Sequence, residues 1–229
     1  MHEAHAVPVI CLDGPSGSGK GTVGRMLARR LGWHFLDSGA LYRLVAVAAR
    51  QAGIDLGAAD ELAGLAYALD VAFSGDEQGR ERIELAGQEV TAAVRAETTG
   101  ADASRVAAYP AVREALLARQ QASRQAPGLI ADGRDMGTVV FPDAPLKIFL
   151  IASAEERARR RHKQLMEHGI DASIPSLIKE IEGRDRQDRE RRIAPLKPAL
   201  DALTIDSTGR LPEHLCEEII ALGRDRKLC

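Results

Sequence analysis

VPVICLDGPSGSGKGT, residues 7–22, is the stretch of sequence that decides the fold. Residues 7–12 are apolar and rich in β-branched side chains, which predicts a buried strand. A glycine-rich loop follows. From residue 20 to residue 31 apolar side chains recur every three or four positions, which predicts a helix that ends at Gly32. A strand, a glycine-rich loop and a helix in this order are typical of a phosphate-binding loop.

The loop reads GPSGSGKGT and carries its lysine where the phosphate-binding pattern requires one. Its glycines let successive backbone N–H groups turn toward one phosphate group, and Lys20 can reach the β- and γ-phosphates. The general pattern has Ser or Thr directly after the lysine, whereas this chain has Gly21 and then Thr22. We therefore expect the hydroxyl near Mg²⁺ to come from Thr22, directly or through a water. The expected triphosphate site comprises Gly14, Pro15, Ser16, Gly17, Ser18, Gly19, Lys20, Gly21 and Thr22.

Outside this stretch, short apolar runs alternate with helical periodicity. Further strands are expected at 33–36, 128–131, 146–151 and 202–205, and helices at about 37–52, 110–126, 153–168, 173–190 and 212–222. Strands that alternate with helices form a parallel sheet covered on both faces. We predict an α/β fold with a five-stranded parallel sheet flanked by helices.

Residues 62–105 interrupt this alternation. Two short strands, 69–73 and 82–85, are joined through SGDEQG and followed by GQEVTAAV, a pattern typical of an antiparallel hairpin. We interpret 62–105 as an inserted subdomain with short β-strands. The core then comprises residues 1–61 and 106–229.

Composition and charge exclude several classes of protein. The 229 residues are 45% hydrophobic and 28% charged, with a net charge of −2 and few aromatic side chains, so nucleic-acid binding is not expected. Three scattered cysteines, no signal peptide and no apolar run of about 20 residues favour a cytosolic location without membrane contact. Of the 31 basic residues 25 are arginine, which reflects either coding bias or bidentate phosphate recognition.

Two polar clusters follow predicted strands. LDSGALYR, residues 36–43, lies where open α/β sheets bind ligands, although Ser38 is equally suited to cap the next helix. ADGRDMG, residues 131–137, places Asp132 like the carboxylate that holds Mg²⁺ or its waters in P-loop enzymes. Arg134 lies between two aspartates, and it either meets a phosphate or is simply salt-bridged.

Residues 157–192 contain nine arginines, in the runs RARRRH and RDRQDRERR. Charge runs of this kind usually form solvated helix faces with i,i+4 ion pairs. Two arginine-rich helices around a polar connection at 168–173 are also what a lid over phosphates requires, because arginines stabilise the charge that develops in phosphoryl transfer. We predict a helical lid at about 157–190.

Five runs, in order and across nearly the whole chain, resemble the bacterial cytidylate (CMP) kinases: LDGPSGSGKGT, LDSGALYR, IADGRDMGTVVFPDAPLKIFL, ASAEERARRR and RDRQDRERRIAPLKPALDALTIDST. The resemblance implies an adenylate-kinase-like fold and transfer of the γ-phosphoryl group of ATP to CMP or dCMP with Mg²⁺. The insertion at 62–105 is a mark of the bacterial type, and its position between the acceptor-binding segments indicates a subdomain that binds the nucleoside monophosphate, on the acceptor side.

The resemblance further implies which residues bind CMP. Those expected on its phosphate are Arg43, Arg134 and Arg191. Those expected on the cytosine are Ser104, Arg113 and Asp135, and those near the sugar are Arg184 and Asp188. Ser38 and Tyr42 share a motif with Arg43 and complete the set. The register near Ser104 is open, because VRAETTGADASR is less similar to the family than the other runs.

The expected chemistry needs no general base, because the second pKa of a nucleoside monophosphate is about 6. Lid residues Arg157, Arg160 and Arg161 are all candidates for phosphate contacts. Catalysis is expected from Lys20, Arg134, Arg160 and Arg161, with Mg²⁺ held near Thr22 and Asp132. We expect a monomer that binds ATP and CMP or dCMP. The alternatives are a kinase for UMP, AMP or a shikimate-like acceptor, and a nucleotide-dependent switch.

Overall fold

The computed structural model describes residues 7–75, 81–167 and 171–228. The chain divides into two compact units. We call Met1–Asp37 together with Gln120–Cys229 the core unit, and Ser38–Arg119 the insert unit.

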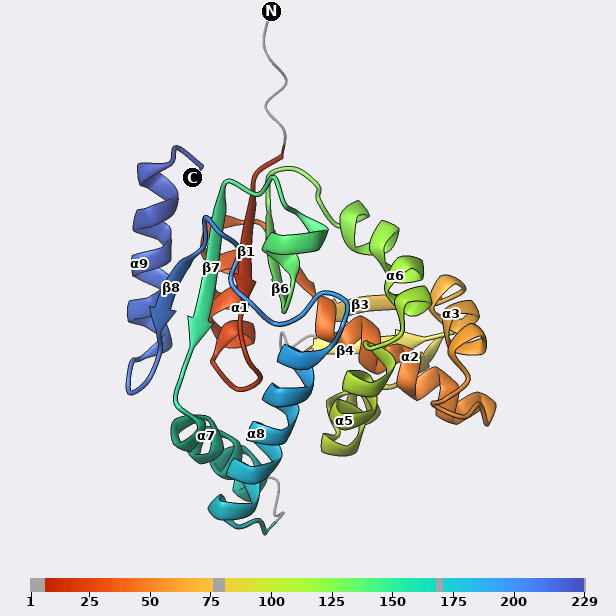
Figure 1. The fold of residues 1–229 in the computed structure, drawn as a ribbon. Helices are drawn as coiled ribbons and strands as arrows, with labels where there is room; N and C mark the ends of the chain where they lie inside the picture. Colours follow the sequence, from red (N-terminus) through yellow and green to blue (C-terminus); the bar gives the residue numbers. More distant parts are fainter. Residues whose placement is uncertain (1–6, 76–80, 168–170, 229) are drawn as a thin grey trace, which may run out of the picture. The chain divides into compact units, whose positions relative to one another are not determined.

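The core unit is built on a five-stranded parallel sheet with the order β2-β6-β1-β7-β8 (Figure 1). Its central strand is β1, all of whose residues are buried, as a strand covered on both faces requires. In the register, Ile10 lies opposite both Ile130 and Leu146. The strands are β1 (Val9–Asp13), β2 (His34–Asp37), β6 (Leu129–Gly133), β7 (Leu146–Ile151) and β8 (Leu203–Asp206).

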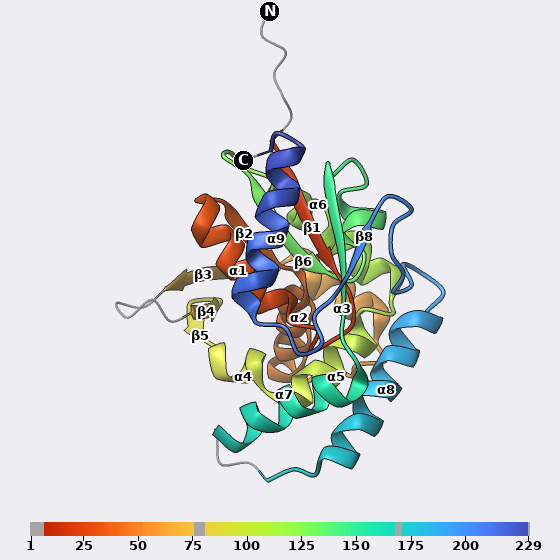
Figure 2. The ribbon, with the colours of Figure 1, turned by 90° about the vertical axis from the view of Figure 1, so that its left-hand side faces the viewer.

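Two helices, α1 (Lys20–Leu31) and α9 (Pro212–Asp225), lie side by side against this sheet (Figure 2). α1 contributes Val23 and Leu27 to the buried core, and α9 contributes Leu215 and Ile219. Burial of each such side chain stabilises the fold by about 1.5–3 kcal/mol. Gly32 ends α1 in the left-handed conformation, with φ 67°, as the sequence predicted.

The predicted lid corresponds to two helices, α7 (Ala154–Glu167) and α8 (Ile174–Glu190), which follow β7 and pack against each other (Figure 1). Ala158, Leu165 and Leu177 are buried between them and form a small apolar core apart from that of the sheet. Ser173 caps α8, since its Oγ accepts the N–H of Ser176.

The insert unit contains a three-stranded sheet, in which β4 is antiparallel to both neighbours. Its strands are β3 (Val71–Gly75), β4 (Glu81–Leu85) and β5 (Gln88–Glu89). α2 packs against α3 and α5, and all but the end of α6 belongs to this unit. The helices are α2 (Ser38–Ala52), α3 (Ala59–Tyr67), α4 (Thr91–Arg95), α5 (Glu97–Val106) and α6 (Pro110–Ala122).

The α/β class, the parallel sheet and the hairpin agree with the sequence prediction, and each predicted strand end lies within two residues of the observed one. Three helices, α3, α4 and α5, were not predicted, because segments such as ETTGADASRV have weak helix propensity and form a helix when packed against α2. The short π-helical segment η1 (Met136–Val140) was also missed, and α6 ends four residues earlier than predicted.

Some predicted features lie partly outside the described residues, namely 76–79 of the hairpin connection and 168–170 of the lid connection. The predicted insertion, 62–105, lies inside the insert unit, and its acceptor-side role stays a prediction. Within the described ranges, none of the helices is both long and apolar enough to cross a bilayer.

Candidate functional site

The glycine-rich loop leaves β1 at Gly14, where only glycine fits. The φ angle of Gly14 is +145°, and a Cβ there would lie 2.1 Å from the carbonyl oxygen of Leu150. At the other end of the loop, Gly19 precedes α1 and offers no side chain to cap it. The first N–H groups of α1 are thus left for another acceptor, which is the arrangement that binds phosphate groups.

The side chain of Lys20 folds back over this loop. Its Nζ donates to the carbonyl oxygen of Pro15 at 2.7 Å and to Oγ of Ser18 at 3.4 Å. Burial and then the nearby Arg134 guanidinium lower the pKa of Lys20, whereas Asp132 raises it. A cation that has lost most of its hydration interacts strongly with an anionic ligand, so Lys20 suits a phosphate chain.

Three consecutive carbonyl groups of the loop, those of residues 16–18, accept hydrogen bonds from residues outside it. Arg157 Nη1 donates to Ser16 O at 3.1 Å, and Arg160 Nη1 to Gly17 O at 3.4 Å. Ser207 Oγ donates to Ser18 O at 2.8 Å. These bonds fix the peptide planes of the loop, so the lid helix α7 and the end of β8 stabilise its conformation.

Arg157 and Asp185 form a buried ion pair that joins α7 to α8. Their side chains are 4% and 6% exposed, and two hydrogen bonds of 3.0 and 2.6 Å connect them. Arg157 also donates through Nε to the carbonyl oxygen of Ala152. Because the same guanidinium binds α8, the loop and the end of β7, this pair anchors α7 and α8 to the phosphate-binding loop and the sheet of the core unit.

We expect Asp185→Asn to lower the free energy of unfolding by about 3 kcal/mol, because it leaves a buried guanidinium without its counter-charge. Urea denaturation monitored by circular dichroism would measure the loss. The matched control is Asp143→Asn, whose side chain is 60% exposed and pairs with Arg124, so its loss should stay below about 1 kcal/mol. Equal losses in the two variants would contradict an anchoring role for Asp185.

Four arginines, namely Arg134, Arg161, Arg184 and Arg191, form what we call the arginine cluster. Burial and then Arg134 lower the pKa of Arg184, and burial and then Arg184 lower the pKa of Arg161. Burial is the larger cause of both shifts, and repulsion between neighbouring guanidinium groups adds to it. A cleft that holds arginines close together despite their repulsion is suited to polyanions, because an anion removes the repulsion.

Asp188 is the carboxylate within this cluster. Its Oδ2 accepts from Arg134 Nε at 3.1 Å, and its Oδ1 lies 3.9 Å from Arg191 Nη1. Arg134 is therefore salt-bridged to Asp188, which lies 54 positions away in the sequence. This carboxylate thus faces two arginines of the cluster. The predicted contact of Asp188 with the sugar stays a prediction.

Oxygen ligands for a divalent cation lie near the start of α1. Burial raises the pKa of Asp132, while Lys20 lowers it. The Asp132 Oδ2 atom would lie 3.4 Å from a Cβ at position 21, so this carboxylate faces the first turn of α1, where Thr22 is exposed. In the part of the chain that the structure describes, no three His, Cys, Asp or Glu side chains gather as a metal site. One carboxylate beside a phosphate site is nevertheless a typical donor set for Mg²⁺, which keeps several waters.

Of the remaining predicted acceptor residues, Asp135 directly precedes η1 in the core unit and is buried, and the others lie in the insert unit. Arg43 donates through Nη1 to the carbonyl oxygens of Val94 and Ala96, at 3.0 and 3.2 Å. The Arg113 guanidinium lies over the ring of Tyr42, 5.6 Å from its centroid. The structure thus brings Tyr42 and Arg113 together. Ser38 is the first residue of α2 and is buried, and Ser104 is half-buried on α5.

Sequence reasoning missed several residues that organise this site. Asp185 belongs to the run RDRQDRERR, but nothing in that run separates it from Asp188. Ser207 is a single serine after β8, 189 positions from the carbonyl group that it binds. Only the packing of distant elements reveals either role.

Comparisons with known proteins agree on one family. The family model described as "Cytidylate kinase" matches residues 10–225. The chain is 60% identical over 223 residues to the cytidylate kinase of Stutzerimonas stutzeri, with 97% of each chain covered. It is 60% identical over 216 residues to that of Pseudomonas aeruginosa, with 94% of each covered. An uncharacterized protein from Eubacterium ventriosum is similar in fold alone, with TM-score 0.52, 11% identity and coverage of 94% of this chain and 97% of that chain.

Proposed function

The chain belongs to the cytidylate kinase family, and from this premise we propose how its own residues carry out the reaction. The protein phosphorylates CMP at the expense of ATP. The observation that carries the residue assignment is the arginine cluster beside the buried ammonium of Lys20.

On the donor side, the loop at 14–22 and the start of α1 bind the triphosphate of ATP. Lys20 exchanges part of its present bonding to Pro15 O and Ser18 Oγ for the β- and γ-phosphate oxygens. The hydrogen bonds of Arg157, Arg160 and Ser207 to the loop carbonyls keep the loop in shape before ATP arrives, so little reorganisation is needed. Thr22 and Asp132 would hold Mg²⁺ or its waters, and bound Mg²⁺ would neutralise charge on the phosphate oxygens.

In the transfer step, a phosphate oxygen of CMP forms a bond to the γ-phosphorus of ATP while the bond from that phosphorus to the β,γ-bridging oxygen breaks. ADP leaves with the bridging oxygen, and no side chain has to remove a proton. Arg43, Arg134 and Arg191 hold the acceptor phosphate. Of the lid arginines, we propose Arg160 and Arg161 for the transferred group and Arg184 near the acceptor sugar, while Arg157 is held by its buried ion pair with Asp185. The lid excludes water, which would otherwise accept the phosphoryl group.

On the base, Asp135 and Arg113 distinguish cytosine from uracil. The 4-amino group of cytosine donates hydrogen bonds, whereas the corresponding oxygen of uracil accepts them. A buried carboxylate such as that of Asp135, which is 3% exposed, therefore favours cytosine. Ser104 reads the same base, and Ser38, Tyr42 and Asp188 line the remainder of the CMP site.

We expect kcat/KM for CMP to exceed that for UMP and for AMP by at least about tenfold. A coupled assay for ADP, run with each acceptor and with none, measures these values. A preference smaller than tenfold would remove the proposed base specificity, and ADP release that does not depend on CMP would indicate a nucleotide switch. The use of dCMP, the monomeric state and the cytosolic location stay predictions.

A further inference from the structure

Asp13 is a buried carboxylate to which the sequence analysis assigned no role. It is the last residue of β1, directly before the phosphate-binding loop, and lies opposite Gly133 of β6 and Phe149 of β7 in the register. Its side chain is 5% exposed. A buried carboxylate costs stability unless its oxygen atoms accept hydrogen bonds, so its partners indicate what it is for.

Both oxygen atoms of Asp13 accept backbone N–H groups at the start of η1. Met136 N donates to Oδ1 and Gly137 N donates to Oδ2, each at 2.8 Å. Burial raises the pKa of Asp13 to about 7, whereas these two N–H groups lower it. Met136 and Gly137 directly follow Asp135 in the chain. Asp13, at the end of strand β1, therefore caps the start of η1 and fixes the backbone next to Asp135.

The fit around η1 leaves little room for movement. A Cβ at Gly137 would lie 3.0 Å from Cδ of Lys147 and 3.4 Å from Oδ2 of Asp13. Lys147 is itself held, because its Nζ donates to Pro142 O at 2.6 Å and to both oxygen atoms of Asp201. Asp13 thus holds the beginning of η1, and Lys147 binds the chain just after its end.

We infer that Asp13 is a positioning residue for base recognition, which holds the peptide groups of 136 and 137 so that the carboxylate of Asp135 meets the cytosine. This inference rests on the proposed role of Asp135. A displacement of a fraction of an ångström is enough to weaken a hydrogen bond to the 4-amino group, and it also relieves the repulsion of the uracil oxygen. Asp13 therefore affects the ratio of kcat/KM for CMP to kcat/KM for UMP.

The test is Asp13→Asn, which keeps the size of the side chain and turns one of its two acceptors into a donor. We expect the ratio of kcat/KM for CMP to that for UMP to fall about tenfold, while KM for ATP stays within about twofold. A general loss of stability would lower activity with both acceptors and leave the ratio unchanged. The control, Asp143→Asn, makes the same change on an exposed residue beyond η1 and should preserve the ratio.

Gly137→Ala perturbs the same backbone from the side of Lys147. If Asp13→Asn does not fold, this variant tests whether the position of η1 controls the selectivity for CMP over UMP. It should also lower the ratio, since the added Cβ pushes η1 away from Lys147. Asp135→Asn serves as the reference, and adding Asp13→Asn to it should cause no further loss of selectivity.

The outcomes separate this inference from the proposed function. If Asp135→Asn abolishes the selectivity while Asp13→Asn and Gly137→Ala retain it, the positioning role is wrong and the base assignment stands. If Asp135→Asn retains the selectivity, the base assignment fails and the positioning role fails with it. A raised KM for ATP with an unchanged ratio would show that Asp13 serves the phosphate-binding loop instead.

Discussion

Replacement of Lys20 by methionine is expected to lower kcat for CMP phosphorylation by about 10³-fold. The ammonium of Lys20 is buried, and its desolvation makes its interaction with the phosphate oxygens stronger than that of an exposed lysine. Charge builds up on the bridging oxygen as the phosphoryl group leaves, and no other lysine belongs to the loop. Methionine fills a similar volume without the charge, so the loss reports the charge itself.

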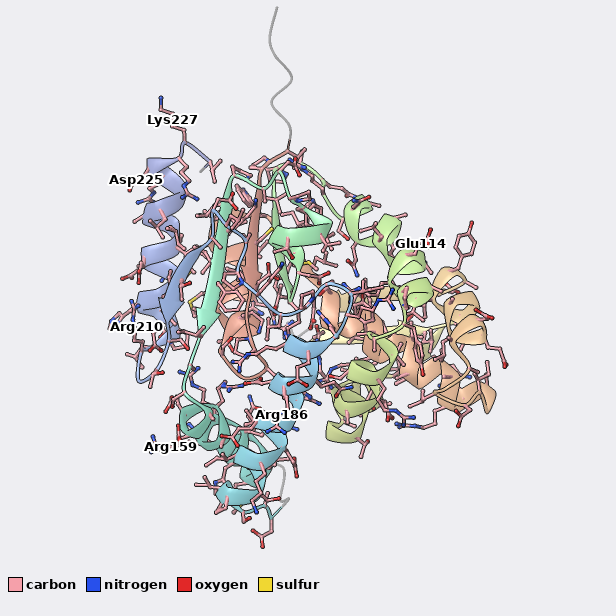
Figure 3. All side chains as sticks on the ribbon, in the orientation of Figure 1. Glu114, Arg159, Arg186, Arg210, Asp225 and Lys227 are labelled. Atoms are coloured by element: carbon pink, nitrogen blue, oxygen red, sulfur yellow. The ribbon has the colours of Figure 1, made fainter. Side chains whose placement is uncertain are left out.

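The measurement is steady-state release of ADP with saturating CMP, combined with circular dichroism to verify the fold. Lys227→Met is the control, since Lys227 is exposed beyond the end of α9, away from the lid helices that carry Arg159 and Arg186 (Figure 3). Its kcat should stay within about twofold of that of the parent protein. A Lys20→Met variant with more than about a tenth of the parent turnover would remove Lys20 from the catalytic set.

Arg134→Ala should also lower kcat by about 10³-fold, with little change in the affinity for ATP. Arg134 is held between Asp188 and the carbonyl oxygen of Gly133, so its guanidinium is oriented before the substrate binds. Its charge matters most when the negative charge of two nucleotides is brought together. Loss of the side chain therefore affects the transfer step more than the binding of one nucleotide.

Two measurements test Arg134 together: kcat with saturating CMP, and equilibrium binding of a non-hydrolysable ATP analogue. The control is Arg186→Ala, an exposed arginine two residues from Arg184 on α8 (Figure 3). If Arg134→Ala retains activity, Arg134 is only the salt-bridge partner of Asp188. If instead the affinity for the ATP analogue falls as much as kcat, Arg134 acts on donor binding and not on the transfer.

Local patterns in the sequence predicted those parts of the protein that neighbouring residues determine. The strand, loop and helix at 7–31 follow from apolar periodicity and from glycines whose φ angles are positive in the structure, such as Gly17 and Gly19. The lid helices follow from periodicity in the same way. The helices at 91–106 were not predicted, because the helix propensity of these residues is weak. Packing against α2 stabilises the two helices more than their own propensity does.

The pairing of charges could not be predicted, because it depends on how helices and strands pack. Asp185 and Asp188 are three residues apart in one charged run, yet one pairs with Arg157 and the other with Arg134. Arg160 stays a predicted phosphate ligand, and its charged run did not indicate that its Nη2 donates to Ser207 O at 2.6 Å and its Nη1 to Gly17 O. Asp13 and Met136 are 123 positions apart, and no local pattern links them.

The small apolar core of the lid has a consequence for the speed of the enzyme. Leu165 and Leu177 belong to an apolar cluster between α7 and α8 that is separate from the core of the sheet. Segments with a small core of their own can open locally without global unfolding. In enzymes with lids, opening and product release often limit turnover. The lifetime of the closed state then depends on residues that touch no nucleotide. Evolution can thus adjust the rate of product release by changing how well two leucines pack, while the chemistry stays the same.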